Sequence, residues 1–458
     1  MNQQDDQSQE GNTIQGRSSE KEAVVDEEDP SLLIRTEERQ GRIPGNVRVR
    51  LVRPSHPSFR RISTGLLEAT DVVQEPHSGL ERLKRILIGA PIASSQAGHE
   101  RLTKFKALAV LSSDAISSVA YATEAILAAI IVAGSGNLWV TLPISFAIVA
   151  LLAIVAISYR QTIPAYPNGG GSYIVAKDNL GTLAGLIAAA SLLIDYVLTV
   201  SVSIAAGVQN LVSLFPSLAS FVVAIDVALV ILVTVINLRG VRESGSIFAI
   251  PTYIFIGSAL VLIAVGSFKS FFLLHNGIVG HFQPVPGVAP LTIFLILKSF
   301  AAGCSAMTGV EAISNGVPAF KKPETRNATL TLTWMAITLG TLFIGITFLA
   351  TSYGIEASKT GNPTVIAQIA QLVFTGPLYF MYPVFQLATL LILTLAANTS
   401  YSDFPRLASL LARDNFLPHQ FAFRGDRLAF SIGIIFLAMM AGILLVVFEG
   451  NTNLLINL

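Results

Sequence analysis

From Ala107 onward the chain is a succession of long apolar stretches, and this pattern limits its possible folds more than any other feature. A helix needs about 20 predominantly apolar residues to cross the ~30 Å hydrocarbon core of a bilayer. Nine stretches predict nine membrane-spanning helices, at residues 107–133, 138–158, 182–206, 217–237, 246–268, 291–316, 329–352, 379–404 and 429–448. We therefore expect an all-α polytopic membrane protein whose transmembrane domain covers residues 107–458.

Composition agrees with this class and argues against others. Only 13% of the 458 residues are charged, against roughly 25% in soluble globular chains. A net charge of +1 offers no case for a nucleic-acid partner. The six histidines are scattered and the one cysteine, Cys304, has no companion, so the pattern predicts neither an enzyme nor a bound cofactor. We interpret the glycine run at 169–171 as a flexible or close-packed turn.

Basic residues in the connections predict the orientation. Membrane proteins carry an excess of lysine and arginine in their cytoplasmic loops. The loops on one side hold only Lys269 and Lys359. The connections on the other side hold eleven basic residues, namely Arg160, Lys177, Arg239, Arg242, Lys321, Lys322, Arg326, Arg406, Arg413, Arg424 and Arg427. The N-terminus is therefore expected in the cytoplasm.

Both ends of the chain differ from the apolar middle. Residues 1–79 are acidic first and arginine-rich later, with so little apolar surface that we expect a disordered cytoplasmic tail, its basic part near anionic lipid. Residues 80–106 form a predicted interfacial amphipathic segment, in which 80–88 could equally be a plain linker helix. The chain stops at Leu458, where GNTNLLINL looks like the approach to a tenth helix, so we expect a C-terminally truncated fragment.

We single out six charged side chains inside the predicted spans. Charge at the bilayer centre is costly and usually marks a path for ions or substrate. The six are Asp114, Glu124, Asp195, Asp226, Lys298 and Glu311. Asp114, Asp195 and Glu311 have polar neighbours at helical spacing, which favours a functional role. Glu124 could be functional or structural, and Asp226 could face an outer vestibule or a partner helix. Lys298 is expected to be a structural counter-ion for one of the acids, or to extend outward to the membrane surface.

The first span combines an acid with hydroxyl groups. Asp114, Ser117, Ser118 and Tyr121 share one face of an ideal helix, at offsets of three, four and seven residues. Serine side chains also compete for backbone hydrogen bonds, which weakens the helix locally. The run therefore predicts an interrupted helix whose exposed oxygens could bind a cation.

Spans three and six repeat this combination. In span three, Asp195, Thr199 and Ser203 follow one another at helical spacing, with Tyr196 adjacent. In span six, the corresponding stripe is Cys304, Thr308, Glu311 and Asn315, flanked by Gly303 and Gly309, which permit a break or a close approach. Hard alkali cations prefer carboxylate, hydroxyl and carbonyl oxygen. A small monovalent cation is thus the expected cargo.

The two candidate broken helices, spans one and six, are separated by five spans. This spacing is typical of a five-plus-five inverted repeat in which the two interrupted helices meet near the midplane. The predicted fold is therefore such a repeat with discontinuous helices 1 and 6, incomplete after span nine.

Several long motifs carry a resemblance to a known family. They are LTKFKALAVLSSDAISSVAYATE (102–124), SYRQTIPAYPNGGGSYIVAKDNLG (158–181), LLIDYVLTVSVSIAAG (192–207), NLRGVRES (237–244) and KSFAAGCSAMTGVEAISNGVPAFKKPETRNA (298–328). The chain resembles the amino acid–polyamine–organocation superfamily, of LeuT-type fold, and within it the KimA family of bacterial potassium importers. The resemblance implies proton-coupled potassium import across the cell membrane, with a homodimer in the full-length protein.

The resemblance also implies roles for eight positions. Asp114 and Tyr121 match the acid and tyrosine of the ion path in span one. The potassium ligands that it implies are Asp195, Thr199, Ser203 and Thr308, with Tyr196 beside them and Glu311 in span six. The alternative is an amino acid or polyamine permease of the same superfamily. Because Asp114 would repel a substrate carboxylate, a cationic amine is the most plausible form of that alternative.

Overall fold

The computed structural model describes the backbone of four short strands between residues 35 and 69, and residues 101–458 apart from 168, 170, 240–244, 274–285, 359–360 and 424–429. Of residues 245–247 it describes the backbone alone. The chain divides into two compact units, Met1–Arg85 and Ile86–Leu458. We describe each unit by itself.

The first unit contains two antiparallel hairpins. Strand β1 (Arg35–Gln40) pairs with β2 (Val47–Val52), and β3 (Phe59–Ser63) pairs with β4 (Leu66–Ala69). These strands differ from the disordered tail expected for residues 1–79. The expectation weighed low apolar content and overlooked the alternation of valine and arginine in VRVRLV, whose period of two residues suits a strand. Residues 1–34 and most of the predicted interfacial segment, 80–100, lie outside the described residues.

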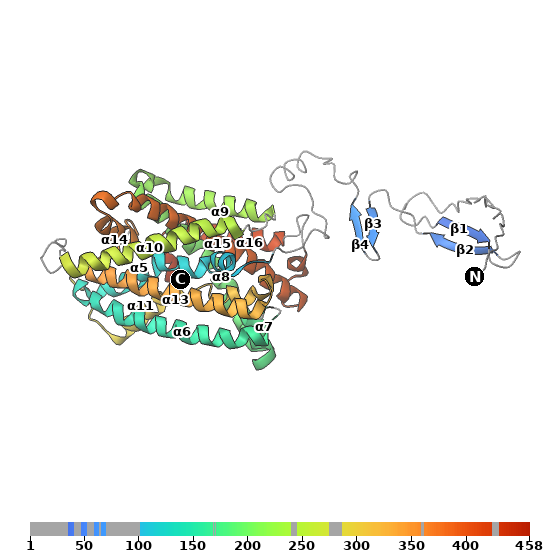
Figure 1. The fold of residues 1–458 in the computed structure, drawn as a ribbon, viewed down its shortest axis with the longest axis horizontal. Helices are drawn as coiled ribbons and strands as arrows, with labels where there is room; N and C mark the ends of the chain where they lie inside the picture. Colours follow the sequence, from blue (N-terminus) through green and yellow to red (C-terminus); the bar gives the residue numbers. More distant parts are fainter. Residues whose placement is uncertain are drawn as a thin grey trace, which may run out of the picture. The chain divides into compact units, whose positions relative to one another are not determined.

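The second unit is helical in the residues described, and its long helices run side by side (Figure 1). The helices are α3 (Lys104–Leu111), α4 (Ser113–Ser117), α5 (Val119–Ile130), α6 (Thr141–Ala165), α7 (Ser172–Leu180), α8 (Thr182–Leu214), α9 (Val222–Leu238), α10 (Gly245–Leu273), α11 (Ile293–Gly303), α12 (Ala312–Asn315), α13 (Glu324–Ser352), α14 (Val365–Val373), α15 (Met381–Arg413), α16 (Ser431–Val447) and α17 (Thr452–Ile456). Short 3₁₀ segments join several of them.

Seven of these helical segments in the described part of the chain are long and apolar enough to cross a membrane. They are Ser135–Ala165, Thr182–Leu214, Pro216–Leu238, Phe248–Phe272, Ile293–Asn315, Glu324–Ser352 and Gly376–Arg413. Two of the nine predicted spans are shorter than expected. The first is divided into α3, α4 and α5, because the helix is interrupted, and the ninth is represented by the 17 residues of α16.

Helix packing leaves an apolar exterior and a mixed interior. The most extensive helix pair is α8 with α15, and α6 lies along α13. Large apolar side chains such as Phe146, Ile231 and Trp334 are exposed on the outside. Since a soluble monomer rarely exposes so much apolar surface, this exterior suits contact with lipid. The buried polar groups lie between the helices instead, on α4, α5, α8 and α15.

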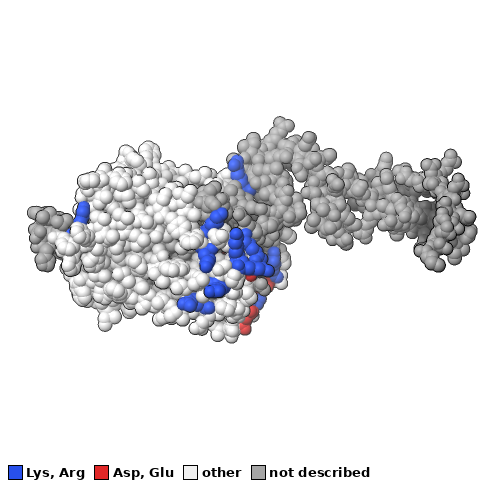
Figure 2. Space-filling view, viewed as in Figure 1, with Lys and Arg blue, Asp and Glu red and all other residues white. Residues whose placement is uncertain are grey.

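Charged side chains mark one end of the helical unit (Figure 2). We call it the basic end and define it by Arg160, Lys177, Lys321, Lys322 and Arg413, which lie at or beside helix ends. The chain reaches it at the end of α6, in α7, before α13 and at the end of α15. Lys269, near the end of α10, lies at the opposite end. This distribution agrees with the alternation of basic and non-basic connections in the sequence.

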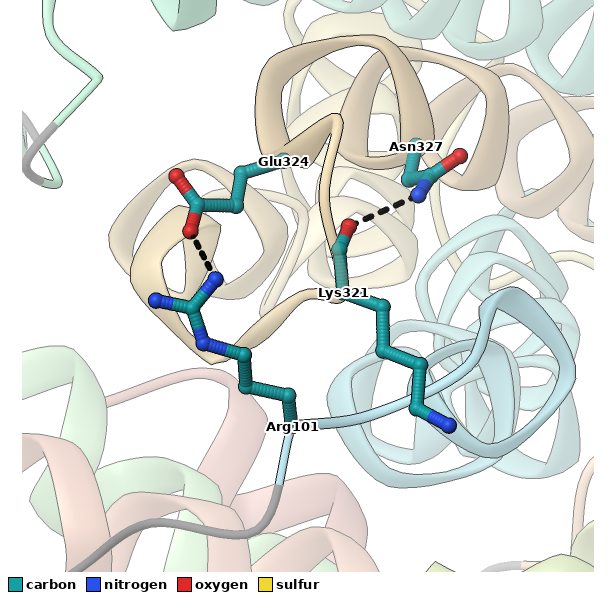
Figure 3. Close-up of polar contacts among 4 residues, drawn as sticks. All are labelled: Arg101, Lys321, Glu324 and Asn327. Atoms are coloured by element: carbon teal, nitrogen blue, oxygen red, sulfur yellow. Dashed lines mark hydrogen bonds and ion pairs between the residues drawn. The ribbon is translucent and has the colours of Figure 1, made fainter. Parts of the chain in front are cut away.

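At the basic end, the start of α3 is attached to the segment that precedes α13 (Figure 3). The amide of Leu102 donates to the carbonyl of Ala319 at 2.7 Å, and the amide of Lys321 donates to the carbonyl of Leu102 at 3.0 Å. Arg101 forms an ion pair with Glu324, while Asn327 donates to the Lys321 carbonyl (Figure 3). The beginning of the first interrupted helix and the end of the second are therefore held together.

A second polar contact at the basic end joins α7 to the end of α15. Lys177 Nζ and the Tyr173 hydroxyl both donate to Asp414 Oδ2, at 2.6 and 2.5 Å. These two hydrogen bonds, that from Lys177 first, lower the pKa of the Asp414 carboxyl. Both charged side chains are 35% exposed, so solvent screens the pair.

We expect the Asp414→Asn variant to be less thermally stable than the wild type at neutral pH. A lowered pKa in the folded state stabilises the protein above the ordinary aspartate pKa of about 3.9, and this contribution is lost as the pH falls through the lowered value. The gap in melting temperature should therefore close at acidic pH, as measured in detergent across a pH series. Lys177→Met should produce an overlapping loss that does not add to the first. A gap that persists at the most acidic pH would contradict the assignment.

Candidate cation site

Two helices are interrupted in the middle of the helical unit, as the serines and glycines predicted. The first break separates α3, α4 and α5 at Ser112 and Ser118. The second follows α11 and the 3₁₀ segment η7 (Cys304–Met307), where Thr308 is extended and Gly309 has a φ of 74°. Glycine adopts this left-handed conformation without steric cost, whereas other residues do not. Backbone groups in both breaks are thus released from the regular helical pattern.

The two breaks contact each other. Ser118 Oγ donates to the carbonyls of Ala115 and Ala306, at 2.6 and 2.9 Å. The Tyr121 hydroxyl lies 3.5 Å from Thr308 Oγ1. Gly309 packs so closely on Asp114 that a Cβ atom at this position would lie 2.5 Å from the carboxylate oxygen Oδ2. The carboxyl group of the first interrupted helix therefore lies directly against the bend of the second.

Asp114 is a buried carboxyl group with an oxygen available to bind a cation or a proton. Its side chain is 3% exposed, and Oδ1 has no hydrogen-bond partner among the described residues. Glu311, Asp195 and Asp403 lie within electrostatic range of it. Glu311 is buried beside the second break, at the residue before α12. An unpaired buried carboxyl is expensive in a membrane, which favours occupation of the site by a cation or a proton.

Helix α8 supplies further oxygens. Tyr196, Thr199 and Ser203 are buried, and within the described residues neither Thr199 Oγ1 nor Ser203 Oγ has a hydrogen-bond partner. Asp195 is half-buried and lies within electrostatic range of Glu311. Tyr196 is within range of Asp114, Asp195, Glu311 and Asp403. In this way α8 faces the two interrupted helices with a carboxyl and a tyrosine.

The eight residues predicted from sequence separate into two groups. Contacts and electrostatics bring together six of them, which are Asp114, Tyr121, Asp195, Tyr196, Thr308 and Glu311. Thr199 and Ser203 lie one and two turns further along α8 from Asp195, roughly 6 and 12 Å by helical rise. Their free hydroxyls suit a cation, but no described contact joins them to the other six. Their part in binding stays a prediction.

Two predicted stripes of polar side chains cross helix breaks. The span-one stripe crosses the break at Ser118, and the span-six stripe of Cys304, Thr308, Glu311 and Asn315 crosses the break at Thr308 and Gly309. Because Ser118 keeps helical dihedral angles whereas Thr308 and Gly309 do not, the helical period is lost in the span-six stripe. Ser117 and Ser118 donate to the backbone carbonyls of Asp114 and Ala115, so their hydroxyls support the bent backbone.

Sequence reasoning missed Asp403 on α15. This carboxyl is buried and lies within electrostatic range of Asp114, Tyr196 and Glu311. It also pairs with Arg406 at 3.6 Å, which is 56% exposed. Ser113 Oγ lies 3.3 Å from Thr399 Oγ1, which joins α4 to α15 one turn before Asp403. The available signal was the polar run NTSYSD at 398–403, which ends a predicted span and places an acid inside it.

Of the remaining intramembrane charges, Lys298 is exposed on α11, and the described residues give it no carboxylate partner. Of the two alternatives for Lys298, its exposure therefore agrees with an outward-pointing side chain and not with a counter-ion. Asp226 is fully buried, and a Cβ atom on Gly450 would lie 2.3 Å from its Oδ2. It thus meets the turn between α16 and α17 and not an open vestibule. Glu124, on α5, is buried against the start of α14, where it accepts hydrogen bonds from the Val365 amide and from Asn453.

Comparisons with known proteins bear on this arrangement. Residues 102–458 match the family model for amino acid permease. The chain is 50% identical to the potassium transporter KimA of Bacillus subtilis over 376 residues, which are 82% of this chain and 61% of that protein. It is 24% identical to the low-affinity putrescine importer PlaP of Escherichia coli K12 over 289 residues, 60% of each protein.

A third relative is a probable potassium transport system protein, Kup 1 of Rhizobium johnstonii. Identity is 29% over 222 residues, which cover 47% of this chain and 31% of that protein. The chain spans about three fifths or less of the length of these relatives. The family match extends over more than three quarters of the chain and includes both interrupted helices. The chain belongs to the amino acid permease family.

Proposed function

We propose that the chain is a secondary active transporter that imports potassium, coupled to protons. The observation that carries the proposal is the buried carboxyl of Asp114, which lies between two helix breaks beside hydroxyls and further acids and whose Oδ1 has no hydrogen-bond partner among the described residues. Carboxylate, hydroxyl and backbone oxygens form the donor set that an alkali cation prefers. The 50% identity to a potassium transporter supports the same cargo. The relatives named above are all transporters, which agrees with a chain that is not an enzyme.

In this proposal, oxygen atoms of the protein replace the water molecules that surround a potassium ion in solution. They come from the backbone carbonyls at the two helix breaks and from the side chains of Asp195, Thr199, Ser203 and Thr308. Asp114 and Glu311 act as proton carriers or ion ligands. A proton and a potassium ion compete for one carboxylate, because each neutralises the same charge. Such competition couples the two fluxes, since occupation by one ion changes the affinity for the other. No cofactor is involved beyond the transported potassium and the coupling proton.

The fold suggests how access alternates. Under the predicted five-plus-five repeat, spans one, two, six and seven rock against spans three, four, eight and nine around the site. The first group includes both interrupted helices, and the second includes the paired helices α8 and α15. By the positive-inside rule, the basic end faces the cytoplasmic side of the cell membrane in this proposal. We also propose a homodimer for the full-length protein, with no nucleic-acid partner.

A cationic amine is the second candidate substrate. It is supported by the similarity to a putrescine importer, and by Asp114, which would attract an ammonium group as well as potassium. The same acid argues against an ordinary amino acid. Permeases of that kind hold the substrate carboxylate at backbone amides near a helix N-terminus, and Asp114 would repel it here.

We expect the Asp195→Asn variant to fail in cells that depend on it for potassium. A bacterium that lacks potassium uptake should grow at low external potassium with the full-length wild type and not with the variant, because the half-buried carboxylate is lost as a ligand. Expression and membrane insertion are measured in parallel. Growth of the variant at the wild-type rate, with equal expression, would remove Asp195 from the site.

A further inference from the structure

Helix α14 lies in the connection between α13 and α15, at the end opposite to the basic end. Its residues Val365, Ile366, Ala367, Ile369, Ala370 and Val373 are all buried. Gln371 and Leu372 are exposed and Gln368 is partly so, which means that α14 buries a broad face and presents the opposite face outward. It contacts α5, α8, α10, α13 and α15. This short helix therefore closes the helical unit at that end.

The first turn of α14 is held in place by hydrogen bonds to polar groups of α8. Thr364 caps the helix by accepting from the amide of Ala367 at 3.3 Å. The same hydroxyl donates to Asn210 Oδ1 of α8 at 2.9 Å, and the Thr364 amide donates to Ser213 Oγ at 3.1 Å. Such contacts satisfy amides that the start of a helix otherwise leaves without partners.

Glu124 of α5 completes this attachment. Its side chain is 4% exposed, and Oε2 accepts from the amide of Val365 at 3.0 Å. Asn453 of α17 donates to Oε1 at 3.4 Å. A carboxylate at a helix N-terminus is favoured by the helix dipole, and Lys269 complements it by donating to the Val373 carbonyl at the other end. One acid thus joins α5, α14 and α17.

Glu124 is also one turn from the candidate cation site. Tyr121 precedes it by three residues on α5, and the Tyr121 hydroxyl contacts Thr308 in the second break. Because residues three apart on a helix share a face, α5 presents its site contact and its α14 contact on the same side. A movement of α5 that disturbs the Tyr121 contact would therefore also change the distance between Glu124 and Val365 wherever α14 stays in place.

We propose that Glu124 is a positioning residue that ties α14 to the cation site, so that α14 lifts only when α5 moves. Lifting α14 breaks the hydrogen bond from Val365 to a buried carboxylate, and leaving Oε2 of that carboxylate without its donor is costly. The inference rests on the proposed transport in treating α14 as the lid of a path. The contacts that carry it do not depend on the identity of the cargo.

The test measures how often α14 opens. Ala367, buried on α14, is replaced by cysteine in a protein whose single native cysteine is removed by Cys304→Ala. A membrane-impermeant thiol reagent then labels position 367 in vesicles that contain the full-length protein. We expect Glu124→Ala to increase the labelling rate about tenfold, the change in an opening equilibrium when one hydrogen bond to a charged group is lost.

Two further variants distinguish the effect of the hydrogen bond between Glu124 and Val365 from the effect of the negative charge of Glu124. Glu124→Gln should label close to the parent rate, because its amide oxygen still accepts from Val365. Its amide NH2 group can donate to Asn453 Oδ1, which lacks a partner among the described residues, once the Asn453 side-chain amide turns over. Val365→Pro removes the donor and retains the acid. Proline is accommodated at the first position of a helix, so this variant should fold and label faster. It serves as the second route if Glu124→Ala folds poorly.

Thr123→Val is the matched control. It removes a buried hydrogen bond of 2.9 Å between α5 and Thr347 of α13, away from α14. Labelling at the parent rate in this control, together with faster labelling in Glu124→Ala and Val365→Pro, supports the proposal. Three results would overturn it: no increase in either variant, an equal increase in the control, or labelling of Glu124→Gln as fast as Glu124→Ala, which would make charge the essential property. Labelling requires no transport, so a failed uptake assay would count only against the proposed function.

Discussion

Potassium uptake by the Asp114→Asn variant is expected to fall at least about a hundredfold. The substitution preserves shape and removes the charge of a side chain whose Oδ1 has no partner in the described structure. A contact of about 4 Å between unit charges contributes roughly 4 kcal/mol at an effective dielectric constant of about 20. Most of this interaction is lost with the carboxylate. Uptake is measured in proteoliposomes that contain equal amounts of each protein.

Folding is controlled separately in this experiment. Replacing an unpaired buried carboxyl with an amide removes a desolvation cost, so the melting temperature of the Asp114→Asn variant should not fall. Asp178→Asn, which neutralises an exposed acid on α7, should leave uptake unchanged. Uptake by Asp114→Asn within a factor of two or three of the wild type would place the ion path elsewhere.

The second large effect is expected for Gly309→Ala. Gly309 has a φ of 74°, which costs an L-residue about 1–2 kcal/mol. The new Cβ atom would also lie 2.5 Å from Asp114 Oδ2, so the carboxylate or the bend of the second helix must move. We expect both a lower melting temperature and a loss of uptake of at least tenfold, since geometry at the site is disturbed.

Gly257→Ala is the control for this prediction. Gly257 lies in α10, and an added Cβ atom meets nothing within 4 Å. Alanine is the better helix former, so this variant should be at least as stable as the wild type and equally active. If Gly309→Ala behaved in the same way as Gly257→Ala, the close contact between Gly309 and Asp114 would have no part in transport.

Much of this arrangement can be predicted from local sequence. Apolar length predicted the position of the spans, and clustered serines with Gly309 predicted the two breaks, because each acts through its own backbone. The glycine run was interpreted as a flexible or close-packed turn, and the contacts of Gly169 and Gly171 agree with the close-packed alternative. A Cβ atom on Gly169 would lie 2.8 Å from the carbonyl oxygen of Asn315, and one on Gly171 would lie 2.8 Å from its side-chain oxygen.

The features that were missed depend on distant contacts. Asp403 lies near the site because α15 packs on α4. That contact between distant segments cannot be predicted from the spacing of residues within either helix. The role of Glu124 was left open because its donors, Val365 and Asn453, come from α14 and α17. Helix α14 itself was not predicted, since nine residues are too few to form a span. The stripe argument failed where the helix is broken, because side chains beyond a break no longer follow the helical period.

The central claim is that the site between the interrupted helices transports potassium. The most direct measurement is uptake of potassium and of putrescine, side by side, into proteoliposomes that contain the full-length protein under an inward proton gradient. We predict that potassium accumulates, that dissipating the gradient abolishes accumulation, and that excess putrescine does not compete. Accumulation of putrescine without potassium uptake would contradict the claim and would assign this site to organic cations.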